Sequence, residues 1–510
     1  MLNHAVTPDS LRLHRLALVA VLAVTVWRVV WLAASKAELG VDEAQYWFWS
    51  QSLEWGYFSK PPVIAWIIRA TTGLLGSDSP FAVRIASPLL QGATALLVMQ
   101  FARDIAGIRT GALAGLLYLV MPAAMVGSMT ISTDTPMLFF LALSLVLWLR
   151  LVRSASLWQA VLLGLAVGAA ILSKYAMLFL LPGLVLAALS LPSWRLRRRD
   201  AAVVALSATL AVAPNLWWNI EHGFATLRHT ASIAQWAGLQ LHPGEGAIFL
   251  ASQFAVFGPV FFGVILWQSA RILFGRGNEA LRGAVLLTLP VLVVMTGQAL
   301  LSHAYANWAV GAAVGGSLLA ALSLQTAPRL LAAALVLQGA LAVALPMLPA
   351  VAIDLRLPNG QALFKRYTGR ADVANFALDL ARANGLYGVV AAERPLLADL
   401  FYQARDGGQK VFAAPQSGAP TNHYAMANAL PDKVPGQILF LVDAVVADKL
   451  LHASSGIDEI GRITPGSGWA LGRSFVALRV PAGFWQMENA VGTARGEDGL
   501  PLPAVSGDAG

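Results

Sequence analysis

Two adjacent carboxylates and a lysine stand out in residues 41–66, VDEAQYWFWSQSLEWGYFSKPPVIAW. Asp42 and Glu43 open this stretch, many aromatic residues follow, and Lys60 precedes the rigid pair Pro61 and Pro62. A carboxylate that faces an apolar, partly dry pocket has a raised pKa and can act as a general base. A lysine held at a turn can bind a phosphate as a point charge. The stretch therefore predicts an active-site loop with a base at one end and a phosphate at the other.

Each of these residues also has a purely structural interpretation. Asp42 can cap the helix that DEAQYWFWSQ predicts, while Glu43 complements the helix dipole. Lys60 can reach from the membrane edge to lipid headgroups. Tyr46 and Tyr57 belong to an aromatic group that suits the headgroup layer, and in a site they would contact substrate. Capping and catalysis are compatible, because a capped helix start is a rigid platform.

The composition places this stretch in a membrane protein. Hydrophobic residues make up 57% of the 510 residues and charged residues only 12%, about half the charged share of soluble domains. A formal net charge of +8 is compatible with a nucleic-acid partner, but the positive residues form short clusters between apolar runs, which is the orientation signal of membrane proteins. We therefore expect a lipid bilayer and no nucleic acid as partner. The chain has no cysteine, which leaves no disulfides or thiolate metal sites.

About eleven apolar runs are long enough to cross a bilayer as helices. The first is too long for a signal-peptide core and is expected to be retained. The fifth and sixth runs nearly touch at Ser173 and Lys174. The runs fall at residues 14–34, 81–102, 110–128, 134–152, 157–173, 175–193, 201–219, 246–268, 283–301, 305–324 and 329–350.

The arginines predict the orientation of these runs. With the N-terminus in the cytoplasm, nearly every arginine cluster falls in an inner connection, as at residues 103–109, 150–153, 195–199 and 271–282. The loop at 35–80 and the other candidate residues then lie on the outer face. Residues 1–350 are thus expected to form a membrane domain with its active-site loop outside.

The composition changes after residue 350. Short β-type runs, GVVAA, KVFAA, ILFLV and FVALRV, alternate with the helical runs RPLLADLFYQAR and VADKLLHA. This alternation predicts a small α/β domain over residues 351–486. An odd number of spans places that domain outside. Residues 487–510, rich in glycine, proline and alanine, are expected to be a disordered tail.

Further charged residues lie at the predicted outer boundary or inside the spans. Asp134, in SMTISTDTP, either begins an ordinary helix or adds a second carboxylate to the site. Lys174 is either an interfacial lysine or a second phosphate contact. Arg84 lies just inside the second run and Arg28 well within the first. A guanidinium inside a span usually faces a cavity or a partner, so either arginine can also pair with an acid such as Asp42 or Asp134.

Polar residues also cluster at the outer end of the tenth run. His303, Tyr305 and Asn307 occur in SHAYANW, where a histidine at a membrane edge is more often structural than a ligand. The motif NLWWNIEHGF, residues 215–224, carries two tryptophans that form either an anchoring belt or a substrate wall. No set of histidines and acids has metal-ligand spacing. The sequence therefore indicates no cofactor, and a divalent cation is not indicated either.

Taken together, these motifs resemble a known family. The Asp-Glu pair after the first run, GYFSKPPVIAW, FAVRIASPL, STDTP, the Ser-Lys junction and HAYANW occur in the order and spacing of the GT-C membrane glycosyltransferases of the protein O-mannosyltransferase superfamily. The chain is most similar to the bacterial branch of lipid A aminoarabinose transferases and lipopolysaccharide galacturonosyl transferases. The resemblance covers residues 1 to about 325. No WWD-type signature is present, which argues against the oligosaccharyl transferase branch.

The resemblance implies an inverting glycosyltransferase in the bacterial inner membrane. Its donor would be a polyprenyl-monophosphate sugar used on the periplasmic face, and its acceptor a cell-envelope glycolipid such as lipid A or lipopolysaccharide core, another glycan or a protein. Asp42 would take the proton from the acceptor. Glu43 would orient the acceptor or tune Asp42, and Asp134 would be a further polar wall. Lys60, Arg84 and Lys174 would stabilise the departing phosphate. Tyr46, Tyr57, His303, Tyr305 and Asn307 would contact substrate.

Two other functions are compatible with parts of the sequence. A transporter or flippase for a lipid-linked sugar would place polar groups near the bilayer midplane, often in two related halves. Here the charged candidates lie at the outer boundary. A membrane anchor that displays the α/β domain would not need acids, lysines and aromatic residues beside the membrane. The enzyme is therefore the favoured prediction.

Overall fold

The computed structural model describes residues 7–234, 240–416, 418–453, 456–481 and 483–486. The predicted tail at 487–510 lies outside the described residues. The chain forms two compact units. Unit 1 comprises Met1–Ser35 and Leu53–Val351, and unit 2 comprises Lys36–Ser52 and Ala352–Gly510. The segment Lys36–Ser52 is thus part of the same unit as the C-terminal residues.

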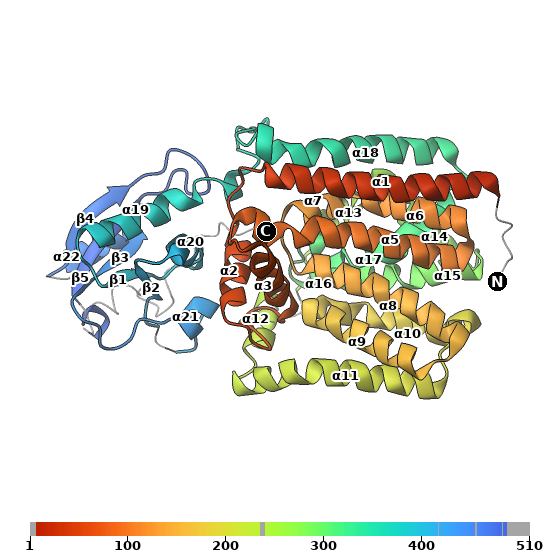
Figure 1. Ribbon diagram of the computed structural model, residues 1–510, viewed down its shortest axis with the longest axis horizontal. Helices are drawn as coiled ribbons and strands as arrows, with labels where there is room; N and C mark the ends of the chain where they lie inside the picture. Colours follow the sequence, from red (N-terminus) through yellow and green to blue (C-terminus); the bar gives the residue numbers. More distant parts are fainter. Residues whose placement is uncertain (1–6, 235–239, 417, 454–455, 482, 487–510) are drawn as a thin grey trace. The chain divides into compact units, whose positions relative to one another are not determined.

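Unit 1 is a bundle of helices that run back and forth (Figure 1). Many of them begin with a proline, which suits a first turn because its missing N–H would have no helical partner there. The helices are α1 (Pro8–Ala33), α3 (Val63–Leu75), α4 (Pro80–Arg84), α5 (Ala86–Ala106), α6 (Ile108–Leu119), α7 (Pro122–Met129), α8 (Asp134–Ser154), α9 (Leu157–Ser173), η1 (Tyr175–Phe179), α10 (Leu181–Ser190), η2 (Pro192–Trp194), α11 (Arg198–Glu221), α12 (Ala225–Ala234), α13 (Pro243–Phe257), α14 (Pro259–Leu273), α15 (Glu279–Leu286), α16 (Leu289–Leu301), η3 (Ala306–Ala309), α17 (Ala312–Leu324) and α18 (Pro328–Val351).

Six helices in the described part of the chain are long and apolar enough to cross a membrane, or eight spans if each bent helix pair is one span. The six are Pro8–Ala33, Pro80–Ala106, Asp134–Ser154, Arg198–Glu221, Glu279–Leu301 and Pro328–Val351. Shorter apolar helices account for three other predicted runs, at Leu157–Ser173, Tyr175–Ser190 and Ala312–Leu324. A fourth such helix, Val63–Leu75, lies in the predicted loop at 35–80. The predicted count of about eleven spans is therefore not confirmed, whereas a protein that crosses the membrane several times is.

Two predicted spans are broken: the run at 110–128 forms α6 and α7, which bend by 54°, and the run at 246–268 bends more sharply. The run at 246–268 forms α13 and α14, which bend by 119°. Gly258 lies at the break with φ of 91°, a left-handed conformation that glycine adopts without strain, and Pro259 begins the next helix. The expectation of one continuous helix over this run was wrong, because hydropathy alone does not register a Gly-Pro break.

The core of unit 1 lies between closely packed helices. Its cluster of buried residues includes Phe257, Phe261 and Leu318. On α9, a side chain at Gly164 or Gly168 would collide with α11, so the two small residues allow these backbones to approach closely. The bundle is held by such packing of apolar faces, as expected for helices in a membrane.

The arginine-rich helix ends lie together at one end of this bundle. Arg153 near the end of α8 forms an ion pair with Asp104 near the end of α5, at 3.4 Å. The hydroxyl of Ser193 in η2 donates to Glu279 at the start of α15, at 2.7 Å. These contacts join ends that the sequence analysis assigned to the same side of the membrane.

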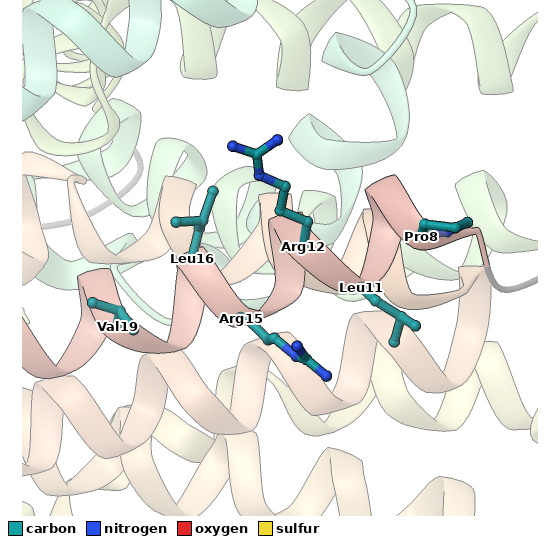
Figure 2. A pocket seen from close by; sticks show the side chains of 6 residues that line it. All are labelled: Pro8, Leu11, Arg12, Arg15, Leu16 and Val19. Atoms are coloured by element: carbon teal, nitrogen blue, oxygen red, sulfur yellow. The ribbon is translucent and has the colours of Figure 1, made fainter.

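The first turns of α1 form a shallow surface hollow that contains two more arginines (Figure 2). The guanidinium groups of Arg12 and Arg15 extend to opposite sides of the helix in that view. Leu11 and Leu16 lie beside them, with 39% and 57% of their surface exposed. Exposed leucines flanked by arginines suit the boundary between acyl chains and headgroups.

Unit 2 contains a five-stranded sheet with helices on both faces. The strand order is β2-β1-β3-β5-β4; β1 runs parallel to β2 and β3, and β5 runs antiparallel to β3 and β4. The elements are α2 (Val41–Gln51), η4 (Lys365–Tyr367), α19 (Arg370–Ala383), β1 (Gly388–Ala391), α20 (Arg394–Gln403), η5 (Ala404–Asp406), β2 (Lys410–Ala413), α21 (His423–Ala427), β3 (Gln437–Asp443), α22 (Ala444–Ala453), β4 (Asp458–Ile463), β5 (Phe475–Pro481) and η6 (Phe484–Gln486).

The sheet agrees with the sequence except at one strand. The four predicted β-type runs form β1, β2, β3 and β5, and the two predicted helical runs form α20 and α22. The core on one face contains Val390 of β1, Phe440 of β3 and Leu450 of α22. The strand β4, DEIGRI, was not predicted, because it is a largely exposed edge strand without an apolar run.

Candidate functional site

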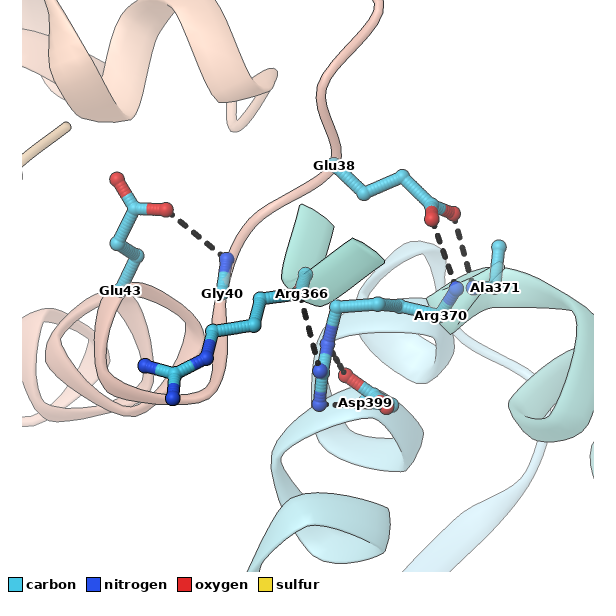
Figure 3. Close-up of polar contacts among 7 residues, drawn as sticks. All are labelled: Glu38, Gly40, Glu43, Arg366, Arg370, Ala371 and Asp399. Atoms are coloured by element: carbon cyan, nitrogen blue, oxygen red, sulfur yellow. Dashed lines mark hydrogen bonds and ion pairs between the residues drawn. The ribbon is translucent and has the colours of Figure 1, made fainter. Parts of the chain in front are cut away.

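The acid pair Asp42 and Glu43 lies in the first turn of α2, in unit 2. The N-cap is Gly40, whose N–H donates to Oε2 of Glu43 at 2.9 Å (Figure 3). Glu43 is buried, at 4% exposure, whereas the side chain of Asp42 is 65% exposed. The capping role expected for Asp42 thus belongs to Glu43, and Asp42 is the acid that can meet a substrate.

Asp42 has a partner that the sequence did not suggest. Nη2 of Arg394, at the start of α20, donates to Oδ1 of Asp42, and Nε of Arg394 donates to Oε1 of Gln45 at 2.6 Å. Burial lowers the pKa of Arg394, but the carboxylate of Asp42 outweighs this effect, so the pKa is raised overall. The guanidinium therefore stays charged and is fixed by two residues one helical turn apart on α2.

A second polar cluster lies in unit 1 and joins three of the predicted residues. Nζ of Lys174, at the end of α9, lies 2.7 Å from Oδ1 of Asp134 at the start of α8. Nδ2 of Asn307 in η3 donates to Oδ2 of the same carboxylate at 3.0 Å. The side chains of Asp134 and Lys174 are each 15% exposed. Each carboxylate oxygen of Asp134 thus has a donor, and the lysine keeps further N–H groups for an anion.

The predicted residues His303 and Tyr305 lie beside each other in unit 1. Their rings meet edge to face at 4.6 Å, and Tyr305 also contacts Trp308. Nδ1 of His303 lies 3.2 Å from Oε2 of Glu245 in α13, and both side chains are about 40% exposed. Glu245 is a candidate that the sequence reading missed. The cluster offers an acid, an imidazole and a phenol to a polar ligand.

The loop that carries Lys60 is tied to α11 and α12, all within unit 1. The N–H of Tyr57 donates to the carbonyl of Lys60 at 3.1 Å, and the carbonyl of Tyr57 accepts from Thr226 at 2.7 Å. Nδ2 of Asn215 donates to the carbonyl of Trp55 at 2.7 Å. The ring of Tyr57 is buried, and burial raises the pKa of its hydroxyl. These bonds fix the backbone at Lys60, as the Lys-Pro-Pro turn predicted.

The two tryptophans after Asn215 have different surroundings. Trp217 is 62% exposed, whereas Trp218 is buried and donates through Nε1 to Oε2 of Glu54 at 2.6 Å. Trp217 therefore suits the anchoring belt. Trp218 instead holds the loop that carries Glu54. This role is neither the anchoring belt nor the substrate wall considered from the sequence.

The remaining candidates are buried. Arg84 ends α4 with 1% exposure, and Tyr46 in α2 packs against Trp49 at 5.2 Å. Arg28 in α1 donates to the carbonyl of Leu119 at 2.6 Å rather than to an acid. Among the described residues no group of three or more histidines and acids could hold a metal ion.

Comparison with known proteins identifies the family. Residues 59–218 match the family model described as dolichyl-phosphate-mannose-protein mannosyltransferase. The chain is 41% identical over 430 residues to the lipid A galacturonosyltransferase RgtD of Rhizobium johnstonii, covering 84% of this chain and 91% of that protein. The chain belongs to the GT-C membrane glycosyltransferases. It is also 35% identical over 167 residues, 31% of this chain and 30% of the other, to the undecaprenyl phosphate-alpha-4-amino-4-deoxy-L-arabinose arabinosyl transferase of Pseudomonas aeruginosa.

A solved structure shows the same fold. ArnT from Cupriavidus metallidurans, bound to undecaprenyl phosphate, matches with a TM-score of 0.66 and 16% identity, over 90% of this chain and 97% of that one. The predicted GT-C fold with a small C-terminal α/β domain is thereby confirmed, as is the prediction of a glycosyltransferase. This identification decides for the enzyme over the transporter and the anchor.

The sequence of this glycosyltransferase gave uneven signals for its polar clusters. Asp134, Lys174 and Asn307 were each predicted as site residues because each lies at the end of an apolar run, but their contacts with one another were not predicted. Glu245 and Arg394 could not be predicted, because they lie in ordinary helix starts, HPGE and ERPL. Arg394 is 352 positions away from Asp42 in the chain, and no spacing rule connects them.

We expect the Asp134–Lys174 ion pair to act as one unit in the transferase. Asp134→Asn and Lys174→Met should each lower kcat/KM for the donor roughly 10-fold, and the double variant should be no worse than the single ones, because contacting residues are not additive. The double-mutant cycle measures this coupling. Asp104→Asn, which breaks an ion pair at the arginine-rich end of the bundle, is the control and should leave activity unchanged. Multiplicative losses would contradict the coupling.

Proposed function

We propose that this glycosyltransferase moves a galacturonic acid residue from a polyprenyl phosphate to lipid A or a closely related glycolipid. The observation that carries the proposal is the 41% identity to a lipid A galacturonosyltransferase over 84% of the chain. The structural match to an enzyme with bound undecaprenyl phosphate supports the class of donor. The exposed carboxylate of Asp42 supplies the base that such a reaction needs.

In this proposal Asp42 is the general base. It takes the proton from the acceptor hydroxyl while the hydroxyl oxygen attacks the anomeric carbon opposite the phosphate, and the configuration inverts. The bond between the anomeric carbon and the phosphate oxygen breaks at the same time. The polyprenyl phosphate leaves as a stable anion and needs no acid to protonate it. One base and several cations are therefore sufficient for the chemistry.

The other candidates have supporting roles. Glu43 holds the start of α2 through Gly40 and thereby fixes the backbone of its neighbour Asp42. Lys60, Arg84 and Lys174 stabilise the departing phosphate, on which negative charge grows in the transition state. Asp134 and Asn307 keep Lys174 in place. His303 and Tyr305 contact the sugar and the acceptor. Tyr46 and Tyr57 are buried and support α2 and the Lys60 loop instead.

The proposal places this chemistry on the periplasmic face of the bacterial inner membrane. The arginine-rich ends of unit 1 mark the cytoplasmic side, because positive residues remain there during insertion. The contacts of Asp134 with Lys174 and Asn307 lie at the other ends of these apolar runs, away from the arginines. The Asp134 cluster is therefore proposed to be periplasmic.

We expect thiol labelling to confirm this orientation. The natural chain has no cysteine, so one introduced thiol is unique. Ser77→Cys, in the exposed turn after α3, should react in intact cells with a thiol reagent that does not cross the inner membrane. Arg276→Cys, in the exposed turn after α14, should react only after the membrane is opened. The reverse pattern would overturn the orientation.

A direct assay tests the proposed function. Purified enzyme is mixed with polyprenyl-phosphate galacturonic acid and lipid A, and mass spectrometry follows the lipid A. The expected product is lipid A heavier by one galacturonic acid residue, with free polyprenyl phosphate released in equal amount. Envelope lipids from cells with and without the gene should differ by the same mass. No change in either experiment would refute the assignment of donor sugar and acceptor.

A further inference from the structure

The segment Lys36–Ser52 is held by the C-terminal residues of unit 2 through hydrogen bonds of Glu38 to their backbone (Figure 3). The two oxygens of the Glu38 carboxylate accept from the N–H groups of Arg370 and Ala371, at 2.7 and 2.9 Å. These are the first N–H groups of α19, where a carboxylate is favoured by the helix dipole. The N–H of Glu38 also donates to the carbonyl of Tyr367 at 2.9 Å. The chain just before Asp42 is thus fixed at both its side chain and its backbone.

Aromatic side chains fix α2 itself. Trp47 meets Tyr402 of α20 edge to face at 5.0 Å. Phe48 packs against Phe401 of α20 at 4.6 Å and Tyr424 of α21 at 4.9 Å. Such pairs add to the burial of apolar area and orient the helix about its axis. The direction in which Asp42 points is therefore determined by α20 and α21 rather than by the short helix alone.

The guanidinium of Arg394 completes this arrangement. It is bound to Gln45, which is only 2% exposed, and to Asp42, whose side chain is mostly exposed. An ion pair with this much exposure contributes little to stability. The guanidinium of Arg394 is planar and rigid, is held by the buried amide of Gln45, and points at the exposed carboxylate of Asp42. This arrangement is better explained by a role in orienting that carboxylate.

We propose that Arg394 is a positioning residue for Asp42, and that the C-terminal α/β unit serves to hold the base of the reaction. The inference rests on the proposed role of Asp42. It assigns to α20 the task of selecting one rotamer of the Asp42 side chain, so that a carboxylate oxygen is presented to the acceptor hydroxyl. The α/β domain is then part of the catalytic machinery and not an accessory module.

The test compares three variants of the full-length enzyme. Arg394→Met keeps an unbranched chain as far as about the position of Nε and removes the fork and the charge. We expect kcat to fall by about 10- to 100-fold, because misplacing a reacting group by about 1 Å has effects of that size. The KM for the lipid-linked donor should change by less than about 3-fold. Arg394→Lys should recover part of the loss, since it restores the charge but not the fork.

The pH profile separates positioning from a merely structural role. Removing a cation beside a carboxylate raises the pKa of that carboxylate, so the acid limb of the kcat/KM profile should move to higher pH in Arg394→Met and return in Arg394→Lys. The other ionisable groups near this pair are unchanged in these variants. Glu43 and Tyr46 lie on α2 and Tyr424 on α21, and Arg366 of η4 lies next to the ion pair of Arg370 with Asp399.

Arg382→Met is the control, because Arg382 lies in the last turn of α19 and pairs with the exposed Asp379. It should retain wild-type kcat. If Arg394→Met has wild-type kcat and pH profile while Asp42→Asn is inactive, the inference is wrong and the proposed function stands. If Arg394→Met lowers kcat only together with the melting temperature, and lysine restores neither, the residue is structural and the inference is also wrong. If the wild-type enzyme modifies no lipid A, the proposed function fails independently.

Discussion

Asp42→Asn should lower turnover by about 100- to 10,000-fold, the usual loss when a general base is removed. Asparagine keeps the size of the side chain and can still accept a hydrogen bond from Arg394, but it cannot take a proton at neutral pH. The Asp42 side chain is 65% exposed, so the substitution leaves no buried charge and the fold should be retained. The loss should therefore appear in kcat and not in the amount of inserted protein.

Two measurements isolate this chemical effect. Transfer of the sugar to the acceptor is followed by mass spectrometry, and binding of the lipid-linked donor is measured separately with the inactive variant. We expect donor affinity within about 3-fold of wild type, because the proposed base contacts the acceptor hydroxyl and does not bind the donor. Asp406→Asn, a change of a carboxylate that is 85% exposed in the same unit, is the control. Normal turnover by Asp42→Asn would refute its role as the base.

The fold could be predicted to the extent that apolar runs and helix ends carry it. Helices that begin at prolines, such as Pro80 and Pro328, agree with the starts of the predicted runs at 81–102 and 329–350. The break at Gly258 was missed because the apolar run continues through it, although the adjacent Pro259 is a visible signal. β4 was missed because its residues are mostly polar and exposed.

The candidate site could be predicted only in part, for a related reason. Lys174 and Asp134 each lie at the end of an apolar run, and a membrane brings such ends to a common level, so their ion pair agrees with simple topology. The partner of Asp42 depends instead on tertiary contacts in a water-exposed unit, where no such level exists. Glu38, Gln45 and Arg394 are ordinary polar residues in sequence and become informative only once α2 packs on α20.

Asp399→Ala should destabilise unit 2 more than any exposed substitution in it. Nε and Nη2 of Arg370 donate to the two oxygens of Asp399 at 2.8 and 3.0 Å, and both residues are under 5% exposed. Removing the acid leaves a buried guanidinium without its charge partner, which costs about 3–5 kcal/mol. For a unit of this size that corresponds to a fall in melting temperature of roughly 6–20 °C.

The same pair should be nearly dispensable when both partners are replaced by apolar residues. Burial raises the pKa of the Asp399 carboxyl to about 7 even though Arg370 opposes the shift, so desolvation is the larger effect at this pair. An ion pair with a large desolvation cost can be exchanged for apolar packing at little loss. Arg370→Met combined with Asp399→Leu keeps contact with the ring of Trp469, which lies 4.8 Å from the guanidinium carbon. We therefore expect the double variant to melt well above Asp399→Ala.

Hydrogen exchange gives the decisive measurement, because it reports on unit 2 within the intact membrane protein. Amides of β3, in the middle of the sheet, should exchange faster in Asp399→Ala and at close to the wild-type rate in the double variant. Asp379→Ala, which removes an exposed i,i+3 pair with Arg382 on α19, should change stability by no more than about 0.5 kcal/mol. Since α19 and α20 also hold Glu38 and Asp42, the Asp399→Ala enzyme should lose activity on warming before the double variant does. Equal exchange rates in the two variants would show that the pair contributes through its charges and not merely through filled volume.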